Sequence, residues 1–235
     1  MTKGEMMDRC STTAKELVVG TKGLAKGLTI GATVLLSLTI ILSLLGCYNL
    51  CPDITYMHGG DFHVFLLTIF IYLIVALIEE MVFRGLLFRL TAKWWGTITG
   101  CAVSSLAFGF AHIMSPGASW WSSIAIALSA GILLAVAYKQ SGSLWMPIGI
   151  HWAWNVFEGP VLGYQVSGQE LGPSILHSYI TGPSILTGGP FGPEASVVTI
   201  GICWIMIVVL TCKNRLFRTE HNEDCEPYRH TYHEG

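Results

Sequence analysis

The sequence is poor in charge for its length. Asp, Glu, Lys and Arg make up 12% of its 235 residues, about half the share that is usual in a soluble domain. The net charge is −2, and no basic stripe is interleaved with aromatic residues, which argues against a nucleic-acid partner. Hydrophobic residues reach 52%, the mean hydropathy is +0.56, and the apolar residues are clustered in long runs. The composition therefore predicts a protein whose main partner is the lipid bilayer.

Several sequence signatures are also missing. The seven cysteines form no Cys-x-x-Cys pair and no spacing typical of a zinc ribbon. There is no His-Glu-x-x-His motif and no Gly-x-Ser-Gly motif, and His58-Gly-Gly-Asp61 only approximates the Gly-x-Gly-Asp of aspartyl membrane proteases. Cys47 and Cys51 could form a disulfide if their side of the membrane is oxidising, with two free thiols as the alternative.

Six hydrophobic segments are predicted to cross the membrane as helices. The clearest runs from Leu28 to Gly46 without a charge, and it begins too far from Met1 for a usual signal peptide. The others are Val64 to about Leu90, Thr97 to His112, Ser122 to Tyr138, Leu144 to about Val161, and Val197 to Cys212. The predicted fold class is all-α, a polytopic membrane helix bundle of about six transmembrane helices.

The positions of Lys and Arg predict the topology of this bundle. Basic residues precede the first predicted span, follow the last, and occur at Arg89, Lys93 and Lys139. The connections 47–63, 113–121 and 162–196 contain none. By the positive-inside rule, both termini are expected in the cytoplasm and these three connections outside a cell (plasma) membrane.

One membrane domain is predicted over residues 28–212. A polar lead, residues 1–27, precedes it, and a cytoplasmic tail, residues 213–235, follows it. The outer connection 162–196 is rich in Gly and Pro and repeats Gly-Pro-Ser-Ile-Leu. This loop could cap or gate the bundle, or it could be a simple long connection.

The second predicted span contains two adjacent acids. Fifteen uncharged residues, 64–78, lead into Glu79-Glu80-x-x-x-Arg84. Ionisable groups are costly inside a membrane and are therefore candidates for function. Glu80 and Arg84 share a helix face, so Arg84 is expected to neutralise Glu80, while Glu79 is turned away by about 100° and faces a polar cavity. The structural alternative is that these charges reach the membrane interface.

Two other spans carry a histidine paired with a residue four positions away, Phe108 with His112 and His151 with Asn155. Counting from a turn near Gly96 places Glu79 and His112 at the same depth, about 24 Å of helix from the turn. His151 reaches that level only if the hairpin formed by the second and third predicted spans projects beyond the membrane. The three polar sites would then converge near the cytoplasmic side.

Together these motifs resemble those of the CPBP family (CAAX protease and bacteriocin-processing, also called Abi), and they look like a bacterial, CAAX prenyl protease-like member. The family has Glu-Glu-x-x-x-Arg, Phe-x-x-x-His and His-x-x-x-Asn motifs on separate membrane helices. The matching residues lie within 79–155 and are Glu79, Glu80, Arg84, Phe108, His112, His151 and Asn155. The resemblance covers roughly residues 75–195. Glu158 departs from the pattern, which has a neutral residue there.

The resemblance implies an intramembrane endopeptidase that hydrolyses a peptide bond of a membrane-associated or lipidated peptide or protein. It assigns Glu79 as the general base that activates water, His112 as a residue that holds this water, and His151 and Asn155 as donors to the oxyanion. Glu80, Arg84 and Phe108 would support them.

Three alternatives remain open at this point. No cofactor is favoured, but Glu79, His112 and His151 could instead bind zinc. A non-catalytic reading is a membrane scaffold or a bacteriocin self-immunity protein. A second non-peptidase reading is a small proton-coupled transporter, since buried acids and histidines also form proton relays.

Overall fold

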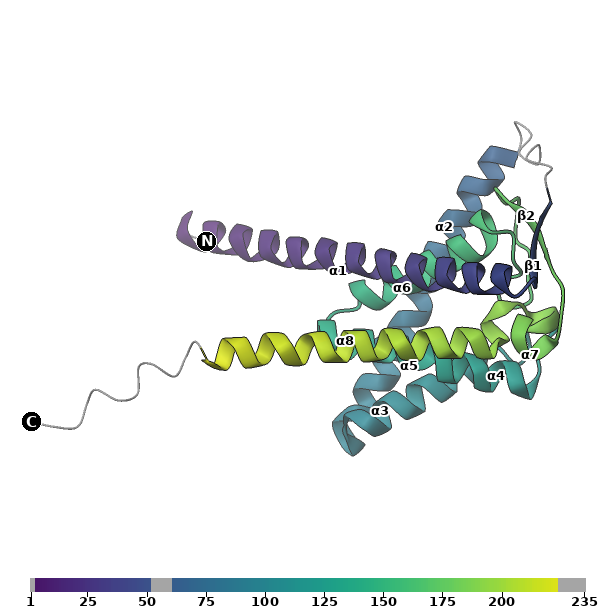
Figure 1. Cartoon of the computed structure of the whole chain (residues 1–235). Coiled ribbons are helices and arrows are strands. Elements are labelled where there is room, and N and C mark those ends of the chain that lie inside the picture. The colour runs from purple at the N-terminus through teal and green to yellow at the C-terminus, as the bar shows by residue number, and fades with distance from the viewer. Residues whose placement is uncertain (1–2, 52–60, 224–235) are drawn as a thin grey trace, which may run out of the picture.

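The computed structural model describes residues 3–51 and 61–223, which are mostly helical (Figure 1). The helices of α type are α1 (Lys3–Leu44), α2 (Asp61–Glu80), α3 (Arg89–Ala111), α4 (Trp120–Ile126), α5 (Ile132–Ser141), α6 (Trp145–Val156), α7 (Ser184–Thr187) and α8 (Val197–Glu223). Three π-helical segments continue them, η2 (Met81–Phe88), η3 (Ala127–Gly131) and η4 (Phe157–Val161). Short 3₁₀ turns, η5 (Gly189–Phe191) and η6 (Pro193–Ala195), precede α8.

Three of these helices are long and apolar enough to cross a membrane, namely Gly20–Leu44, Phe62–Ala111 and Trp120–Ser141. The second is a hairpin, because Gly96 leaves the helical conformation with φ 84°. A shorter apolar helix covers Val197–Cys212, as predicted. The predicted span from Leu28 lies within the first of these helices, and its start stays a prediction. α8 runs on to Glu223, past the predicted end of its span.

One feature of the fold was not predicted, a small antiparallel sheet. β1 (Tyr48–Cys51) pairs with β2 (His177–Ile180), with Tyr48 opposite Ile180 and Cys51 opposite His177. The sheet ties the first outer connection to the long loop 162–196. Cys47 beside it is a buried free thiol, and the side chain of Cys51 lies outside the described residues, as does the His58-Gly-Gly sequence.

α1 and α6 are in backbone contact along a row of glycines. A Cβ added at Gly27 would lie within 2.2 Å of the Met146 carbonyl oxygen, and one at Gly31 within 2.4 Å of the Ile150 carbonyl oxygen. From the other side, a Cβ on Gly149 would lie 2.5 Å from the Leu24 carbonyl oxygen. Small residues at such spacing allow membrane helices to approach closely. They fix α6, which carries His151 and Asn155, against α1.

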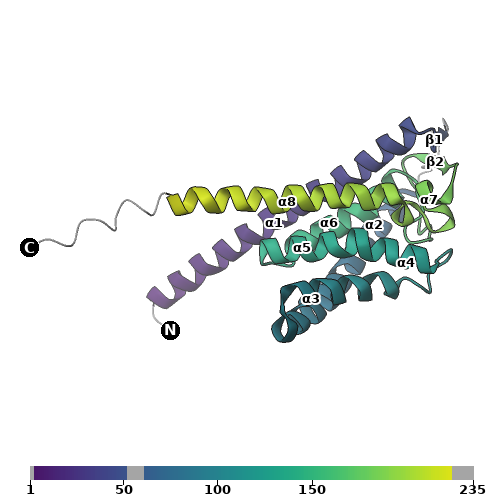
Figure 2. The ribbon, with the colours of Figure 1, turned by 60° about the horizontal axis from the view of Figure 1, so that its bottom comes forward.

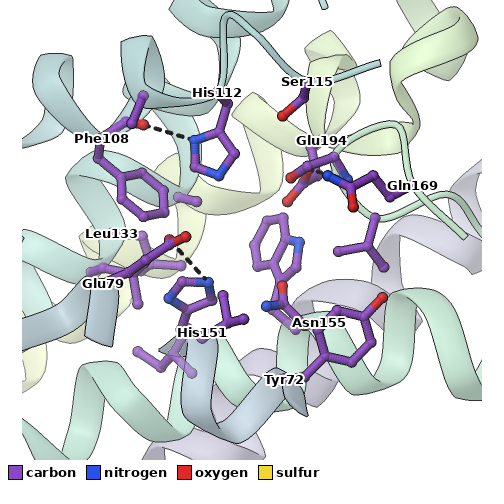
Figure 3. A pocket seen from close by; sticks show the side chains of 18 of the residues that line it. Tyr72, Glu79, Phe108, His112, Ser115, Leu133, His151, Asn155, Gln169 and Glu194 are labelled. Carbon is purple, nitrogen blue, oxygen red and sulfur yellow. Dashed lines mark hydrogen bonds and ion pairs between the residues drawn. The ribbon is translucent and has the colours of Figure 1, made fainter. Parts of the chain in front are cut away.

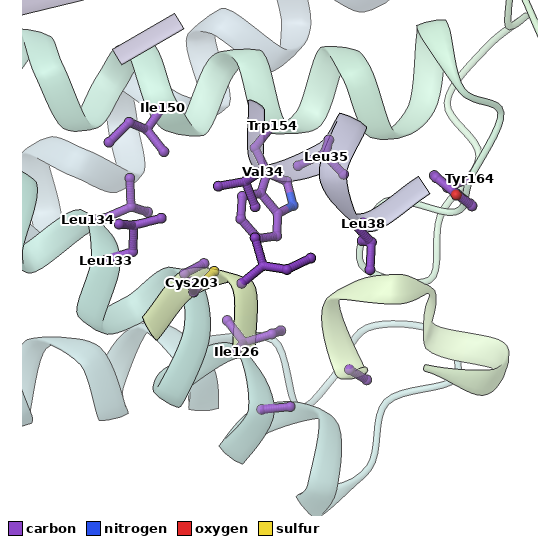
Figure 4. Packing of buried hydrophobic residues seen from close by; sticks show 14 of the residues in the cluster. Val34, Leu35, Leu38, Ile126, Leu133, Leu134, Ile150, Trp154, Tyr164 and Cys203 are labelled. Atoms are coloured by element: carbon purple, nitrogen blue, oxygen red, sulfur yellow. The ribbon is translucent and has the colours of Figure 1, made fainter. Parts of the chain in front are cut away.

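The hydrophobic core lies between α1, α5, α6 and α8 (Figure 4). Its fully buried side chains include Val34, Leu35, Leu38, Ile126, Leu133 and Ile150. By contrast, α2 exposes one apolar face along most of its length, including Phe62, Leu66, Phe70, Ile74 and Ile78. An exposed apolar face on a helix of this length is the surface expected to contact lipid.

The described parts of the three connections without basic residues gather at one end of the bundle. β1, β2 and α7 lie there, while the start of α1 and the end of α8 lie at the opposite end (Figure 2). Two tyrosines hold this end together: Tyr48 of β1 donates a hydrogen bond to the Leu162 carbonyl, and Tyr164 donates one to Thr39 of α1, each at 3.1 Å. Burial raises the pKa of both phenols, so both remain donors at neutral pH.

The α1–α6 contact can be tested by substitution. We expect Gly27→Leu to force the two helices apart and to lower the free energy of unfolding by about 1–3 kcal/mol, the usual cost of overpacking. The measurement is the thermal unfolding midpoint of purified protein in detergent. Gly201→Leu is the matched control, because a Cβ at Gly201 meets no atom within 4 Å. Equal midpoints for the two variants would contradict the packing described.

Candidate active site

A buried ion pair lies at the centre of the site. Arg84 Nη1 donates to Glu80 Oε1 at 2.7 Å, and both side chains are completely buried. The predicted pairing of these two residues is therefore confirmed. Arg84 Nη2 also donates to the carbonyl of Gly131 at 3.1 Å, and the guanidinium carbon lies 4.4 Å from the centre of the Phe108 ring. Arg84 thus connects η2 with η3 and α3.

His151 extends this pair toward Glu79. Its Nδ1 lies 3.0 Å from Glu80 Oε1, the same oxygen that accepts from Arg84. Because a carboxylate can only accept, Nδ1 carries the proton of this hydrogen bond. The other ring nitrogen, Nε2, lies 3.8 Å from Oε2 of Glu79. Glu80 therefore orients the imidazole, and Nε2 is directed at the second acid.

Glu79 differs from its neighbour in its surroundings. Its side chain is 27% exposed, against 0% for Glu80. Its Oε2 is nevertheless shielded from solvent and has no hydrogen-bond partner among the described residues. The two acids thus have separate environments, as their positions on the helix predicted: one is paired, and the other faces a cavity.

Phe108 and His112 form the third part of the site. His112 Nδ1 donates to the Phe108 carbonyl at 2.8 Å, which leaves Nε2 available on the other side of the ring. The Phe108 ring meets the rings of His112 and His151 edge-on, with centroids 5.1 and 5.7 Å away. One aromatic ring therefore sets the orientation of both imidazoles.

These side chains surround a cavity of about 300 Å³ (Figure 3). Glu79 comes from α2, Phe108 and His112 from the end of α3, and His151 and Asn155 from α6. The predicted convergence of the three motifs is confirmed. Among the predicted site residues, Glu80 and Arg84 do not line the cavity but lie behind it.

The predicted depth of the site is wrong. Residues of the connections 113–121 and 162–196 also line the cavity, and these are Ser115, Val166, Ser167, Gln169, Leu171 and Glu194. The site therefore adjoins the connections without basic residues, and not the end of the bundle with Arg89, Lys93 and Lys139, where it was predicted. Helix counting failed because His112 lies at the end of α3, next to the connection 113–121. The hairpin also extends well beyond the site, toward its turn at Gly96.

Glu194 and Ser167 are cavity residues that the motifs did not identify. Ser167 has φ 48°, a backbone conformation that few residues other than glycine adopt. Its N–H and hydroxyl both donate to Glu194 Oε2, at 2.9 and 2.6 Å. Glu194 thereby holds the tight turn 166–169 over the cavity. Only the long loop brings these residues together, so no spacing in the sequence predicts their contact.

Glu158 does not alter the cavity directly. Its side chain is completely buried, and its Oε2 accepts a hydrogen bond from Trp154 Nε1 at 3.1 Å. Among the described residues its Oε1 has no partner. Glu158 lies in η4, which directly follows α6; η3 contributes Ala130 to the cavity, and η2 carries Arg84 behind it. Such segments are frequent at functional sites because they rotate side chains away from the α-helical register.

The metal alternative was tested against the geometry. Both histidines engage Nδ1 with an oxygen, Glu80 Oε1 or the Phe108 carbonyl, which is the outer support that zinc-binding histidines commonly have. However, within residues 3–51 and 61–223 no three His, Cys, Asp or Glu side chains are grouped so that they could hold an ion. The zinc alternative, with Glu79, His112 and His151 as ligands, stays a hypothesis.

An unpaired carboxylate and two oriented imidazoles inside an apolar helix bundle define a membrane protein with a hydrolase-type site. Residues 61–157 match the family described as type II CAAX prenyl endopeptidase, Rce1-like. This segment carries all three motifs, so the motif-bearing part of the chain is similar to the CAAX protease family. The matched range ends at residue 157, whereas the motif resemblance extends to about residue 195. No curated protein and no solved structure matches the chain.

The buried ion pair gives a sharp stability prediction. We expect Arg84→Met to lower the free energy of unfolding by about 3–5 kcal/mol, because the Glu80 carboxylate loses its partner inside the bundle. Adding Glu80→Gln should restore part of this loss, because the uncharged amide still accepts from His151. Thermal unfolding in detergent measures both effects.

The control for these variants is Arg89→Met, which removes an exposed arginine from the same hairpin. If the double variant is less stable than Arg84→Met, the unpaired charge is not the cause of the destabilisation.

Proposed function

We propose that this protein is an intramembrane endopeptidase of the glutamic type, with Glu79 as the general base. The observation that carries the proposal is Oε2 of Glu79, which is shielded from solvent, lacks a hydrogen-bond partner among the described residues, and borders the cavity. A carboxylate in such a place can take a proton from a water molecule bound beside it. Glu80 Oε2 also lacks a partner among the described residues, but Glu80 is completely buried and does not line the cavity, so it is not placed to reach a bound water.

His112 is suited to hold the attacking water. Because its Nδ1 donates to the Phe108 carbonyl, Nε2 is left as an acceptor beside the cavity. A water molecule has two protons, and it can donate one to Glu79 and the other to His112. This arrangement directs its lone pair at a peptide carbonyl in the cavity.

His151 and Asn155 are suited to stabilise the oxyanion. The Asn155 side-chain amide donates without any change of protonation. For His151 Nε2 to donate, the ring must carry both protons, with Glu80 accepting from Nδ1. Water oxygen then bonds to the carbonyl carbon, and Glu79 takes the proton. When the C–N bond breaks, Glu79 returns this proton to the departing amine.

The family supports a peptide or prenylated-protein substrate at a membrane. We infer a multi-pass protein of the plasma membrane with both termini in the cytoplasm, because basic residues flank the opposite end of the bundle from the site. A scaffold or self-immunity protein would not need the acid Glu79 beside a cavity with an oxygen that accepts no hydrogen bond from the described residues. A proton-coupled carrier would instead show transport in liposomes that depends on Glu79 or Glu80.

The first functional prediction concerns the base. We expect Glu79→Gln to lower the cleavage rate by a factor of about 10²–10⁴, the usual contribution of a general base. Comparative peptidomics of cells with either form should identify the peptides cut, and initial rates on one of them give the factor. Glu170→Gln is the control, since it removes an exposed acid near the cavity. Unchanged cleavage in a normally inserted Glu79→Gln protein would refute the proposal.

The second prediction concerns metal. We expect purified protein to keep its cleavage rate after treatment with a strong chelator, because the proposed steps use only protein groups and water. Metal analysis of the same sample accompanies the assay. Stoichiometric zinc, with activity lost on its removal and regained on its return, would instead assign Glu79, His112 and His151 as ligands.

A further inference from the structure

The exposed charges of the bundle are separated by sign. Apart from the buried Arg84, every Lys or Arg whose side chain the structure describes is exposed, and these residues form a basic collar: Lys22, Lys26, Arg89, Lys93 and Lys139. None of them forms an ion pair with a carboxylate among the described residues. The described acids lie elsewhere, in the candidate active site, in η4 or in the connection 162–196. The basic collar therefore carries positive charge that no described acid neutralises.

An aromatic contact places two members of the basic collar at the same level of the bundle. The Phe88 ring of η2 meets the Tyr138 ring of α5 edge-on, with centroids 5.4 Å apart. Arg89 directly follows Phe88, and Lys139 directly follows Tyr138, so the two cations lie near each other. Lys93 lies about one turn further along α3 than Arg89. The hairpin and the end of α5 thus contribute their charges to one place.

α1 brings Lys22 and Lys26 to the same end of the bundle. A Cβ added at Gly20 would lie 3.0 Å from the indole ring of Trp145, and one at Gly23 would lie 3.5 Å from the Trp145 Cβ. α6 begins at Trp145, just after the turn that ends α5. The start of α1, the turn of the hairpin and the end of α5 therefore lie at one end, opposite the small sheet (Figure 2).

A row of exposed apolar side chains leads along the hairpin to the basic collar. Every fourth residue from position 74 to 94 is exposed, by 39% to 71%, and this hairpin row is Ile74, Ile78, Val82, Leu86, Leu90 and Trp94. The Nζ of Lys93 lies 5.7 Å from the centre of the Trp94 ring, at the end of the row. Trp95 and Ile98, beside the turn, are 70% and 87% exposed. Because tryptophan is enriched where membrane helices meet the lipid headgroups, the end of the row is expected at that level.

A phospholipid with a negative headgroup has both parts that this surface would contact. Its acyl chain is apolar, as the hairpin row is, and its phosphate is attracted to Lys and Arg near the membrane surface. We infer that this end of the bundle binds anionic phospholipid, with the acyl chain along the hairpin row and the headgroup at Arg89, Lys93 and Lys139. An acidic protein would neutralise the basic collar but would leave the apolar row uncovered. The inference rests neither on the proposed peptidase chemistry nor on the side of the membrane at which the collar lies.

Lipid titration of the full-length protein in detergent tests this inference. The probes are phosphatidylglycerol and phosphatidylcholine with the same acyl chains, and native mass spectrometry gives the Kd of each. We expect tighter binding of phosphatidylglycerol, because the choline cation of the other lipid is repelled by the basic collar. Equal Kd values for the two lipids would overturn the inference, and this comparison needs no variant.

Substitutions that remove or keep charge test the basic collar itself. Each cation near an anionic lipid surface contributes about fivefold to binding, so Lys93→Gln combined with Lys139→Gln should raise the Kd for phosphatidylglycerol by a factor of about 25. Lys93→Arg combined with Lys139→Arg keeps the charge and should leave this Kd unchanged. Glu170→Gln, which removes an exposed charge from the connection 162–196, should leave it unchanged as well. If the two glutamine substitutions together do not weaken binding, the headgroup does not lie at the collar.

Leu90→Asn tests the hairpin row separately from the charges. It places a polar amide in the row and should weaken the binding of both lipids, because their acyl chains are the same. An effect confined to phosphatidylglycerol would refute the placement of the chain along the row. A polyglutamate peptide is the last probe: equal lipid affinities together with tight binding of this peptide would assign the collar to an acidic protein and not to lipid.

Discussion

The structure depends on a charged pair placed where charge is costly. Glu80 and Arg84 have no exposed surface, and removing two ions from water costs several kcal/mol per ion. Apolar residues of similar size could pack as well or better, so stability does not explain the pair. Its contacts do: Arg84 reaches Gly131 and Phe108, and Glu80 fixes Nδ1 of His151. The pair sets the positions of the helices that carry the motifs.

The motifs of the site were predictable because each one places two of its residues four positions apart on a helix. This spacing fixes which side chains share a face, whatever the tertiary fold is. The different surroundings of Glu79 and Glu80 follow from it, whereas the position of Glu79 and His112 at one cavity was predicted by counting residues from the turn near Gly96. The Gly96 turn was also predictable, since the hairpin needs a break between two apolar runs.

The depth of the site and its outer wall were not predictable in this way. Helix counting assumes ideal α-helices that end at the membrane surface, but π-helical segments follow Glu80 and Asn155, and the hairpin extends past the bundle. The contact of Glu194 with Ser167 joins residues 27 positions apart through irregular backbone. No periodic pattern records such a contact, so only the folded chain shows it.

The glycine row between α1 and α6 has a consequence for the exchange of segments between this chain and similar proteins. α1 lies outside the matched segment 61–157, yet it forms the back support of the helix that carries His151 and Asn155. Neither helix can accept a larger residue at these glycines without moving, because the atoms in the way belong mainly to the backbone of the other helix. A chimera that exchanged the motif helices between relatives would have to carry the first helix along as part of the catalytic unit.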